Sequence, residues 1–204
     1  MIVLYAVVPR GVEVVAPGLC GHDAGPVTVV YEETATPPSP SRDAVAEHGR
    51  RIVALADRGP LLPMRYGTTL PGMAELRSIG VDHGDAWRRR LDRLAGRREL
   101  VVHVAAADVA PPVDGSGRAY LQWRLRAVRR QDHAVEKARE LVLPWADDLR
   151  LLPDRRRLAV LVRIGDADRV RDAVAVYAAA HPDLELVVTG PWPPFSFCEG
   201  AEPS

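Results

Sequence analysis

The sequence holds few cysteines and few aromatic residues, and its uninterrupted apolar runs are short. The two cysteines, Cys20 and Cys198, lack the spacing of a metal site or a redox motif, which predicts a reduced, cytoplasmic protein. Apolar runs such as Ile2–Val8 are far shorter than the roughly 20 residues needed to cross a bilayer. We interpret Ile2–Val8 as a first strand and not as a signal peptide, because no basic segment precedes it.

An excess of charge of one sign is also missing, since 27 Lys and Arg residues balance 27 Asp and Glu residues. No net field therefore favours nucleic acid or an anionic membrane, and neither is expected as a partner. The sequence contains no phosphate-binding loop, no dinucleotide fingerprint and no Gly-x-Ser-x-Gly elbow. We predict a protein that is not an enzyme, with no catalytic residues, no metal and no cofactor.

A few polar residues could still carry chemistry. Asp82, His83 and Asp85 are the nearest approach to a metal cluster, but we interpret them as the start of a helix, where Asp serves as a cap. His103 lies in a predicted strand without evident catalytic partners, which favours a structural role. RNA binding stays an alternative for the arginine runs, although the predicted central strands lack the aromatic residues that stack on bases.

The first part of the chain has the pattern β-β-α-β-α. Its strands are expected at Ile2–Val8, Val27–Tyr31 and Leu61–Gly67. A Gly/Pro loop from Pro9 to Pro26 is expected between the first two, and Pro63 favours an edge position for the third. Apolar residues at intervals of three and four predict one helix before Gly59 and a second helical stretch in two pieces, broken at Gly80 with Asp82 as a cap.

The second part has the pattern β-α-β-β-α-β, which is typical of a ferredoxin-like domain. Its strands are expected at Leu100–Ala106, Leu149–Leu152, Leu158–Ile164 and Leu184–Val188. The long helix from about Arg118 to Leu143 has an apolar stripe that should face the sheet: Leu121, Leu125, Val128, Val135, Ala138 and Val142. We therefore predict a two-domain α+β protein in which an N-terminal domain (1–96) packs against a ferredoxin-like domain with a C-terminal extension (97–204).

Two segments are candidates for contacts with a partner. In "LPMRYGTTL" (Leu62–Leu70), Arg65 and Tyr66 precede a glycine turn, and they either pin that turn or contact another protein. In "TGPWPPFSF" (Thr189–Phe197), prolines restrict the backbone and display three rings: Trp192, Phe195 and Phe197. A restricted backbone lowers the entropy cost of docking, either onto the protein itself or onto a partner.

Four segments together resemble the GvpL/GvpF gas vesicle protein family: "IVLYAVV", "LPMRYGT", "GRAYL" and, most specifically, "TGPWPPFSF". Their order and spacing span essentially the whole chain. Met64, Tyr66 and Phe195 depart from the residues most common in the family, but they keep size and apolarity. The resemblance fits L-type and F-type members alike.

The resemblance implies a non-catalytic accessory or minor structural protein, cytoplasmic and associated with the gas vesicle. It implies binding to the hydrophobic major shell protein, and to other accessory proteins, during vesicle assembly. We assign partner binding to Trp192, Phe195 and Phe197, with Arg65 and Tyr66 as a second patch. The alternative is a small-molecule-binding or enzymatic ferredoxin-like module that uses an inter-domain cleft near His103 and Arg65.

Overall fold

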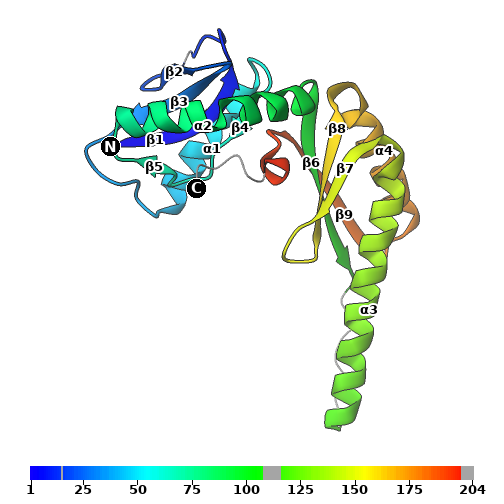
Figure 1. Cartoon of the computed structure of the whole chain (residues 1–204). Helices are drawn as coiled ribbons and strands as arrows, with labels where there is room; N and C mark the ends of the chain where they lie inside the picture. Colours follow the sequence, from blue (N-terminus) through cyan, green and yellow to red (C-terminus); the bar gives the residue numbers. More distant parts are fainter. Residues whose placement is uncertain (15, 108–115, 199–204) are drawn as a thin grey trace. The chain divides into compact units, whose positions relative to one another are not determined.

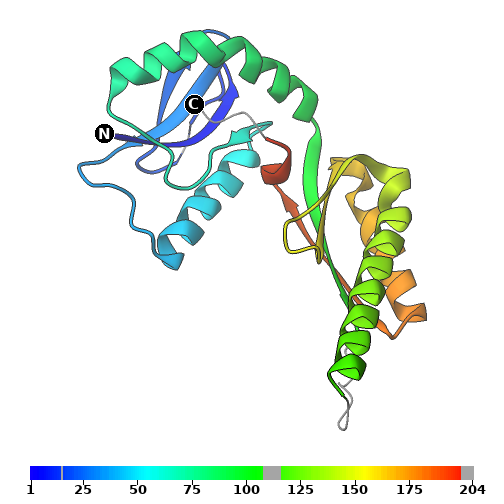
Figure 2. The ribbon, with the colours of Figure 1, turned by 60° about the horizontal axis from the view of Figure 1, so that its bottom comes forward.

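The computed structural model describes residues 1–14, 16–107 and 116–198 and divides the chain into two compact units (Figure 1 and Figure 2). The first unit comprises Met1–Arg97 together with the residues from Trp192 onward. The second unit comprises Arg98–Pro191. The boundary lies beside the expected one at Gly96, but the C-terminal extension groups with the first unit, whereas the sequence placed it with the ferredoxin-like domain.

The first unit contains a five-stranded sheet with its longest strand buried in the middle. The strands are β1 (Ile2–Pro9), β2 (Cys20–Ala24), β3 (Val27–Glu33), β4 (Leu62–Pro63) and β5 (Thr69–Leu70). Their order is β2-β3-β1-β4, with β5 also paired to β1. Residues 2–8 of β1 are all buried, which explains why this run has no polar alternation.

Two expectations about these strands need correction. The Gly/Pro segment between β1 and β3 contains the strand β2, which pairs with β3 and holds the polar sequence Cys-Gly-His-Asp-Ala. The expected strand at Leu61–Gly67 shortens to β4, because the chain turns after Pro63 and returns to β1 as β5. Pro63 does lie on an edge strand, as the missing N–H donor requires.

The two helices of the first unit are α1 (Arg42–Ala56) and α2 (Met73–Leu94). The hydroxyl oxygen of Ser41 caps α1 by accepting a hydrogen bond from the Ala44 N–H at 3.2 Å. Ile52 and Leu55 of α1 pack with β1 and β3 in one core cluster. From α2, the side chains of Leu76, Trp87, Leu91 and Leu94 are buried.

Gly80 does not break α2, which continues without interruption from Met73 to Leu94. A Cβ atom on Gly80 would lie 2.5 Å from the Cβ atom of Ala24, closer than two carbon atoms can approach. The glycine is therefore needed for close contact between helix and sheet, not for a turn. Asp82 lies inside the helix and is not its cap.

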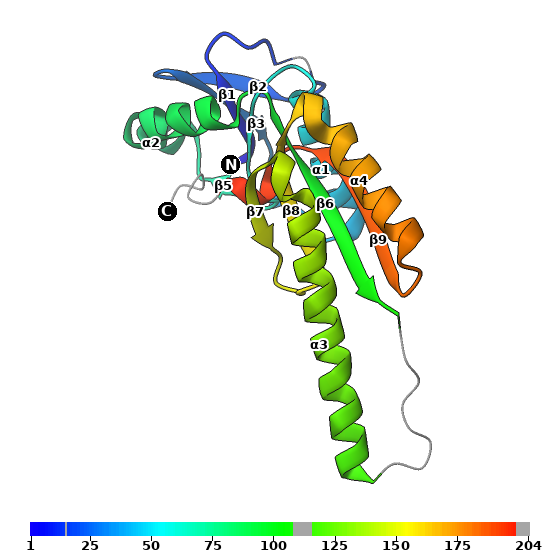
Figure 3. The same cartoon turned by 90° about the vertical axis from the view of Figure 1, so that its right-hand side faces the viewer.

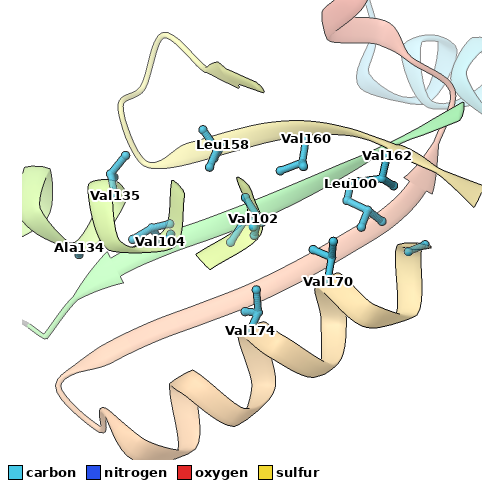
Figure 4. Close-up of a cluster of buried hydrophobic side chains, with 13 residues drawn as sticks. Leu100, Val102, Val104, Ala134, Val135, Leu158, Val160, Val162, Val170 and Val174 are labelled. Atoms are coloured by element: carbon cyan, nitrogen blue, oxygen red, sulfur yellow. The ribbon is translucent and has the colours of Figure 1, made fainter. Parts of the chain in front are cut away.

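The second unit confirms the ferredoxin-like prediction. Its elements are β6 (Arg97–Ala106), α3 (Gly117–Val142), η1 (Leu143–Trp145), β7 (Ala146–Leu151), β8 (Arg157–Arg163), η2 (Ile164–Asp166), α4 (Ala167–Ala180) and β9 (Leu184–Trp192). The strand order β7-β8-β6-β9 places the first and third strands of the motif in the middle of the sheet. Valines and leucines of these strands pack against α3 and α4 in a single core (Figure 4).

The apolar stripe of α3 faces the sheet along only half of its length. Val135, Ala138 and Val142 are buried, as expected. Leu121, Leu125 and Val128 are exposed, because the first half of α3 runs past the end of the strands (Figure 3). Helical periodicity shows which residues share a face, but it does not show where the covering sheet ends.

No helix among the described residues is long and apolar enough to cross a membrane.

We predict opposite effects of alanine at two helical glycines. Gly80→Ala should lower the free energy of unfolding by about 1–3 kcal/mol, because the added methyl group overlaps Ala24. Gly49→Ala in α1, where the new methyl group meets no atom within 4 Å, should raise stability by up to about 1 kcal/mol. Urea denaturation measures both values. Equal effects of the two variants would contradict the close helix–sheet contact at Gly80.

Candidate partner-binding surface

The C-terminal segment buries some of its apolar residues and exposes others. Pro193, Pro194 and Phe197 are buried, and Phe197 retains only 1% of its accessible surface. Trp192 and Phe195 keep 40% and 45% of theirs. The segment therefore has an inner side that packs on the protein and an outer side that presents two large rings to solvent.

Hydrogen bonds fix the backbone of this segment. The Phe195 N–H donates to the Pro193 carbonyl at 2.7 Å, and the Phe197 N–H donates to the Pro194 carbonyl at 3.0 Å. The second bond, between residues three apart, belongs to the short 3-10 helix η3 (Phe195–Phe197). Arg93 of α2 donates from Nη2 to the Phe197 carbonyl at 3.1 Å, which ties η3 to the helix of the first unit.

Earlier in the segment, Arg171 of α4 donates from Nη2 to the Gly190 carbonyl at 2.6 Å. Gly190 has a φ of 107°, which only glycine adopts readily, and a cis peptide bond joins it to Pro191. The conformation of the backbone just before Trp192 therefore depends on this glycine.

The sequence allowed the segment to dock either onto the protein itself or onto a partner, and the structure divides these two roles between different residues. Phe197 docks onto the protein itself, so it anchors the segment and is not available to a partner while buried. Trp192 and Phe195 lie on the solvent-facing side of the segment. The sequence grouped the three rings because it shows apolarity but not which rings point inward.

Arg65 and Tyr66 also differ from each other in exposure. Arg65 is exposed in the loop after β4, and the Thr68 N–H and hydroxyl both donate to its carbonyl, at 3.1 Å and 2.8 Å. Gly67 in this turn has a φ of 86°. The Tyr66 hydroxyl donates to the Ser39 carbonyl, so Tyr66 holds the segment before α1. Arg65 presents a charge at the sheet edge, whereas Tyr66 is half-buried and structural in its contacts.

A buried histidine that the sequence did not single out lies beneath Tyr66. His48 of α1 donates from Nε2 to the Met64 carbonyl at 3.1 Å, and because a carbonyl oxygen only accepts, Nε2 carries a proton. Its ring stacks on Tyr5 with centroids 4.6 Å apart and meets the edge of Tyr66 at 5.3 Å. The signal available in the sequence was only its place on the inward stripe of α1.

Tyr5 connects this aromatic stack to an ion pair. Its hydroxyl donates to Glu32 Oε2 at 2.8 Å, and Arg51 Nη1 donates to the same carboxylate at 3.0 Å. Burial, followed by the hydrogen bond to the Glu32 carboxylate, raises the pKa of Tyr5 to about 12. Burial also lowers the pKa of His48, with a smaller contribution from the nearby Arg51 charge, while the bond to Met64 acts in the opposite direction. His48 is therefore neutral at neutral pH.

The other candidate polar residues lie within regular helices and strands. Asp82, His83 and Asp85 lie within α2, and His83 packs near Trp87 with ring centroids 5.6 Å apart. His103 on β6 shares a hydrogen bond of 3.3 Å with the Thr189 hydroxyl of β9. In the described parts of the chain, no group of three or more His, Cys, Asp or Glu residues could hold a metal ion.

Comparison with known proteins gives a consistent result. A family model described as "Gas vesicle synthesis protein GvpL/GvpF" matches residues 2–199. The chain is 30% identical to gas vesicle protein L of a Streptomyces species, over 78% of this chain and 70% of that protein. It is 27% identical to gas vesicle protein F2 of Halobacterium salinarum, over 85% of this chain and 78% of that protein.

Two solved structures share the fold. The crystal structure of GvpF from Anabaena sp. PCC7120 matches with a TM-score of 0.77 and 15% identity, covering 97% of this chain and 95% of that chain. The crystal structure of GvpF from Microcystis aeruginosa matches with a TM-score of 0.76 and 13% identity, covering 97% and 98%.

We predict that Phe197 and Phe195 contribute differently to stability. Phe197→Ala should lower the free energy of unfolding by about 3–5 kcal/mol, because it leaves a cavity under the C-terminal segment. Phe195→Ala, on the exposed side of the same short helix, should change it by less than about 1 kcal/mol. Urea denaturation provides both values, and similar losses in the two variants would show that the segment is not anchored as described.

We predict that His48 makes stability pH-dependent. Its pKa in the folded state lies below the unfolded value of about 6.5, so the unfolded chain takes up the proton first. The stability of the wild type relative to His48→Gln should be constant above about pH 7.5 and should decrease as the pH falls through about 6.5. The slope should stay below about 1.4 kcal/mol per pH unit, as one proton requires. A difference that is independent of pH between 5 and 8 would contradict the neutral, buried ring.

Proposed function

We propose that this chain, which belongs to the GvpL/GvpF gas vesicle protein family, is a non-catalytic accessory protein that binds the hydrophobic major shell protein during vesicle assembly. The observation that supports the proposal best is the C-terminal segment, with Trp192 and Phe195 exposed on a backbone that Phe197 anchors. Its relatives are named as gas vesicle proteins L and F2.

The physical need for such a protein follows from the chemistry of a shell subunit. Subunits that associate through apolar strands aggregate wherever those strands are exposed before they are placed. A partner can cover an apolar surface reversibly if its own contact residues are few and already ordered. Rings held by prolines and backbone hydrogen bonds meet this condition, because little entropy is lost when they bind.

Arg65 supplies a second element of the proposed surface. It follows β4, the edge strand of the first sheet, and it is exposed there. An edge strand offers unpaired N–H and C=O groups to an extended segment of another protein. Tyr66 supports this edge indirectly, through Ser39 and His48. We assign the contact to Arg65 and the positioning of the loop to Tyr66.

The test is co-expression of this protein with the major shell protein, followed by purification of the complex. Trp192→Ala combined with Phe195→Ala should weaken the complex by about tenfold or more, because both rings lose their contact area. The matched control is Val81→Ala with Val176→Ala, which truncates two exposed apolar side chains on α2 and α4. The control should bind as the wild type does.

If the ring variant folds normally and binds the shell protein as tightly as the wild type, the segment is not the contact surface. The alternative function, a small-molecule-binding or enzymatic module, makes a different prediction for the same purified protein. A reproducible and saturable thermal shift with one compound from a metabolite panel would support that alternative.

A further inference from the structure

The first half of α3, residues 117–130, has features that the proposed function does not use. Here the helix has no strand beneath it (Figure 1 and Figure 3). Leu121, Leu125 and Val128 keep 60%, 59% and 52% of their accessible surface. Their spacing of four and then three residues places them in one stripe on the helix. Isolated exposed leucines are ordinary, but an aligned stripe indicates a contact surface.

A groove lies beside this stripe, within the second unit. It encloses about 430 Å³, and Val128 belongs both to the stripe and to the groove. Tyr120, Trp123 and Ala127 of α3 form its apolar side. The opposite side consists of the end of β6 at Ala106 and the turn between β7 and β8 at Asp154–Arg156. The surface is therefore concave along the helix and not flat.

The charge of this half-helix is one-sided in a chain whose net charge is zero. It holds no Asp or Glu and five arginines: Arg118, Arg124, Arg126, Arg129 and Arg130. None of the five forms an ion pair with another residue in the described ranges. The second half of α3 differs, since Lys137 pairs with Glu140 and Arg139 pairs with Glu136. Within the described ranges, these arginines therefore carry positive charge that would complement carboxylates.

We propose that the first half of α3 and its groove bind an acidic amphipathic helix of a partner protein. The apolar residues of that helix would cover Leu121, Leu125 and Val128, and one large side chain would enter the groove. On a helix with 3.6 residues per turn, Arg118 and Arg124 lie on the two sides of the stripe. Glu or Asp residues flanking the apolar face of the partner helix would meet these guanidinium groups.

Other occupants fit the surface less well. A second copy of this chain would bring five further arginines against the same face, and like charges oppose that contact. An anionic bilayer presents a broad, flat surface and would leave the groove beside the stripe unfilled. RNA would use the arginines but would leave the aliphatic stripe exposed to water. A helix with an apolar face and carboxylate borders satisfies all three features.

The experiment uses the full chain and a labelled helical peptide of about 20 residues that has a leucine stripe flanked by glutamates. Fluorescence anisotropy at low ionic strength should show saturable binding that weakens as salt is added. The same peptide with lysine in place of glutamate should not bind. Leu121→Gln with Leu125→Gln should reduce affinity by about tenfold or more, because the apolar contact is lost.

A charge variant provides a second test that does not depend on the leucines. Arg118→Gln with Arg124→Gln should also reduce affinity by about tenfold. Its matched control is Arg77→Gln with Arg126→Gln, which removes two exposed guanidinium groups away from the stripe and should reduce affinity by less than about threefold. Equal losses in these two variants would show that only overall charge matters and would overturn the proposal.

Further outcomes would also overturn it. These are no binding of the acidic peptide up to about 1 mM, equal binding of the lysine peptide, and preferential binding to phosphatidylserine vesicles or to single-stranded RNA. If the wild type is a dimer in solution and the leucine variant is a monomer, the occupant is a second copy of this chain. A large loss of stability in the leucine variant would show that the chain itself covers the stripe.

Discussion

The burial of one phenyl ring near the end of the chain determines what the rest of the C-terminal segment can do. Phe197 is enclosed by the protein, and Arg93 holds its carbonyl. With this end fixed, the prolines before it leave the backbone few alternatives, and Trp192 and Phe195 stay on the outside. If Phe197 were not buried, Trp192 and Phe195 would sample many positions, and binding would carry the entropy cost of ordering them.

The ferredoxin-like unit could be predicted from the sequence because each of its elements has a strong periodic pattern and clear breaks. The apolar strands and the inward stripe of α3 are local signals, and the strand order follows from the β-α-β-β-α-β connection. The first unit was less predictable. β2 has a polar composition, and it forms a strand because it pairs with β3. β5 forms where the chain returns to pair with β1. β5 depends on pairing between residues far apart in the sequence, and β2 on a hairpin whose first strand lacks an apolar pattern, so periodicity reveals neither.

The candidate surface shows the same limit. Sequence reasoning identified the rings and the arginine-tyrosine pair by composition, but it assigned all of them one role. Burial separates Phe197 from Phe195, and a hydrogen bond to Ser39 separates Tyr66 from Arg65. His48 was missed because a histidine on a helical stripe has no distinctive neighbours in the sequence. In α3, the whole apolar stripe was predicted to face the sheet, but the stripe continues beyond the end of the sheet and is exposed there.

The path of the chain has a consequence for its synthesis. The first unit takes its last residues, including Phe197, from a segment that leaves the ribosome after the whole second unit has been made. A nascent chain that stops within β9 contains all five strands of the first sheet but lacks Phe195 and Phe197. The outer side of the segment can therefore form only after the second unit has been synthesised, so shorter translation products are unable to compete for whatever it binds.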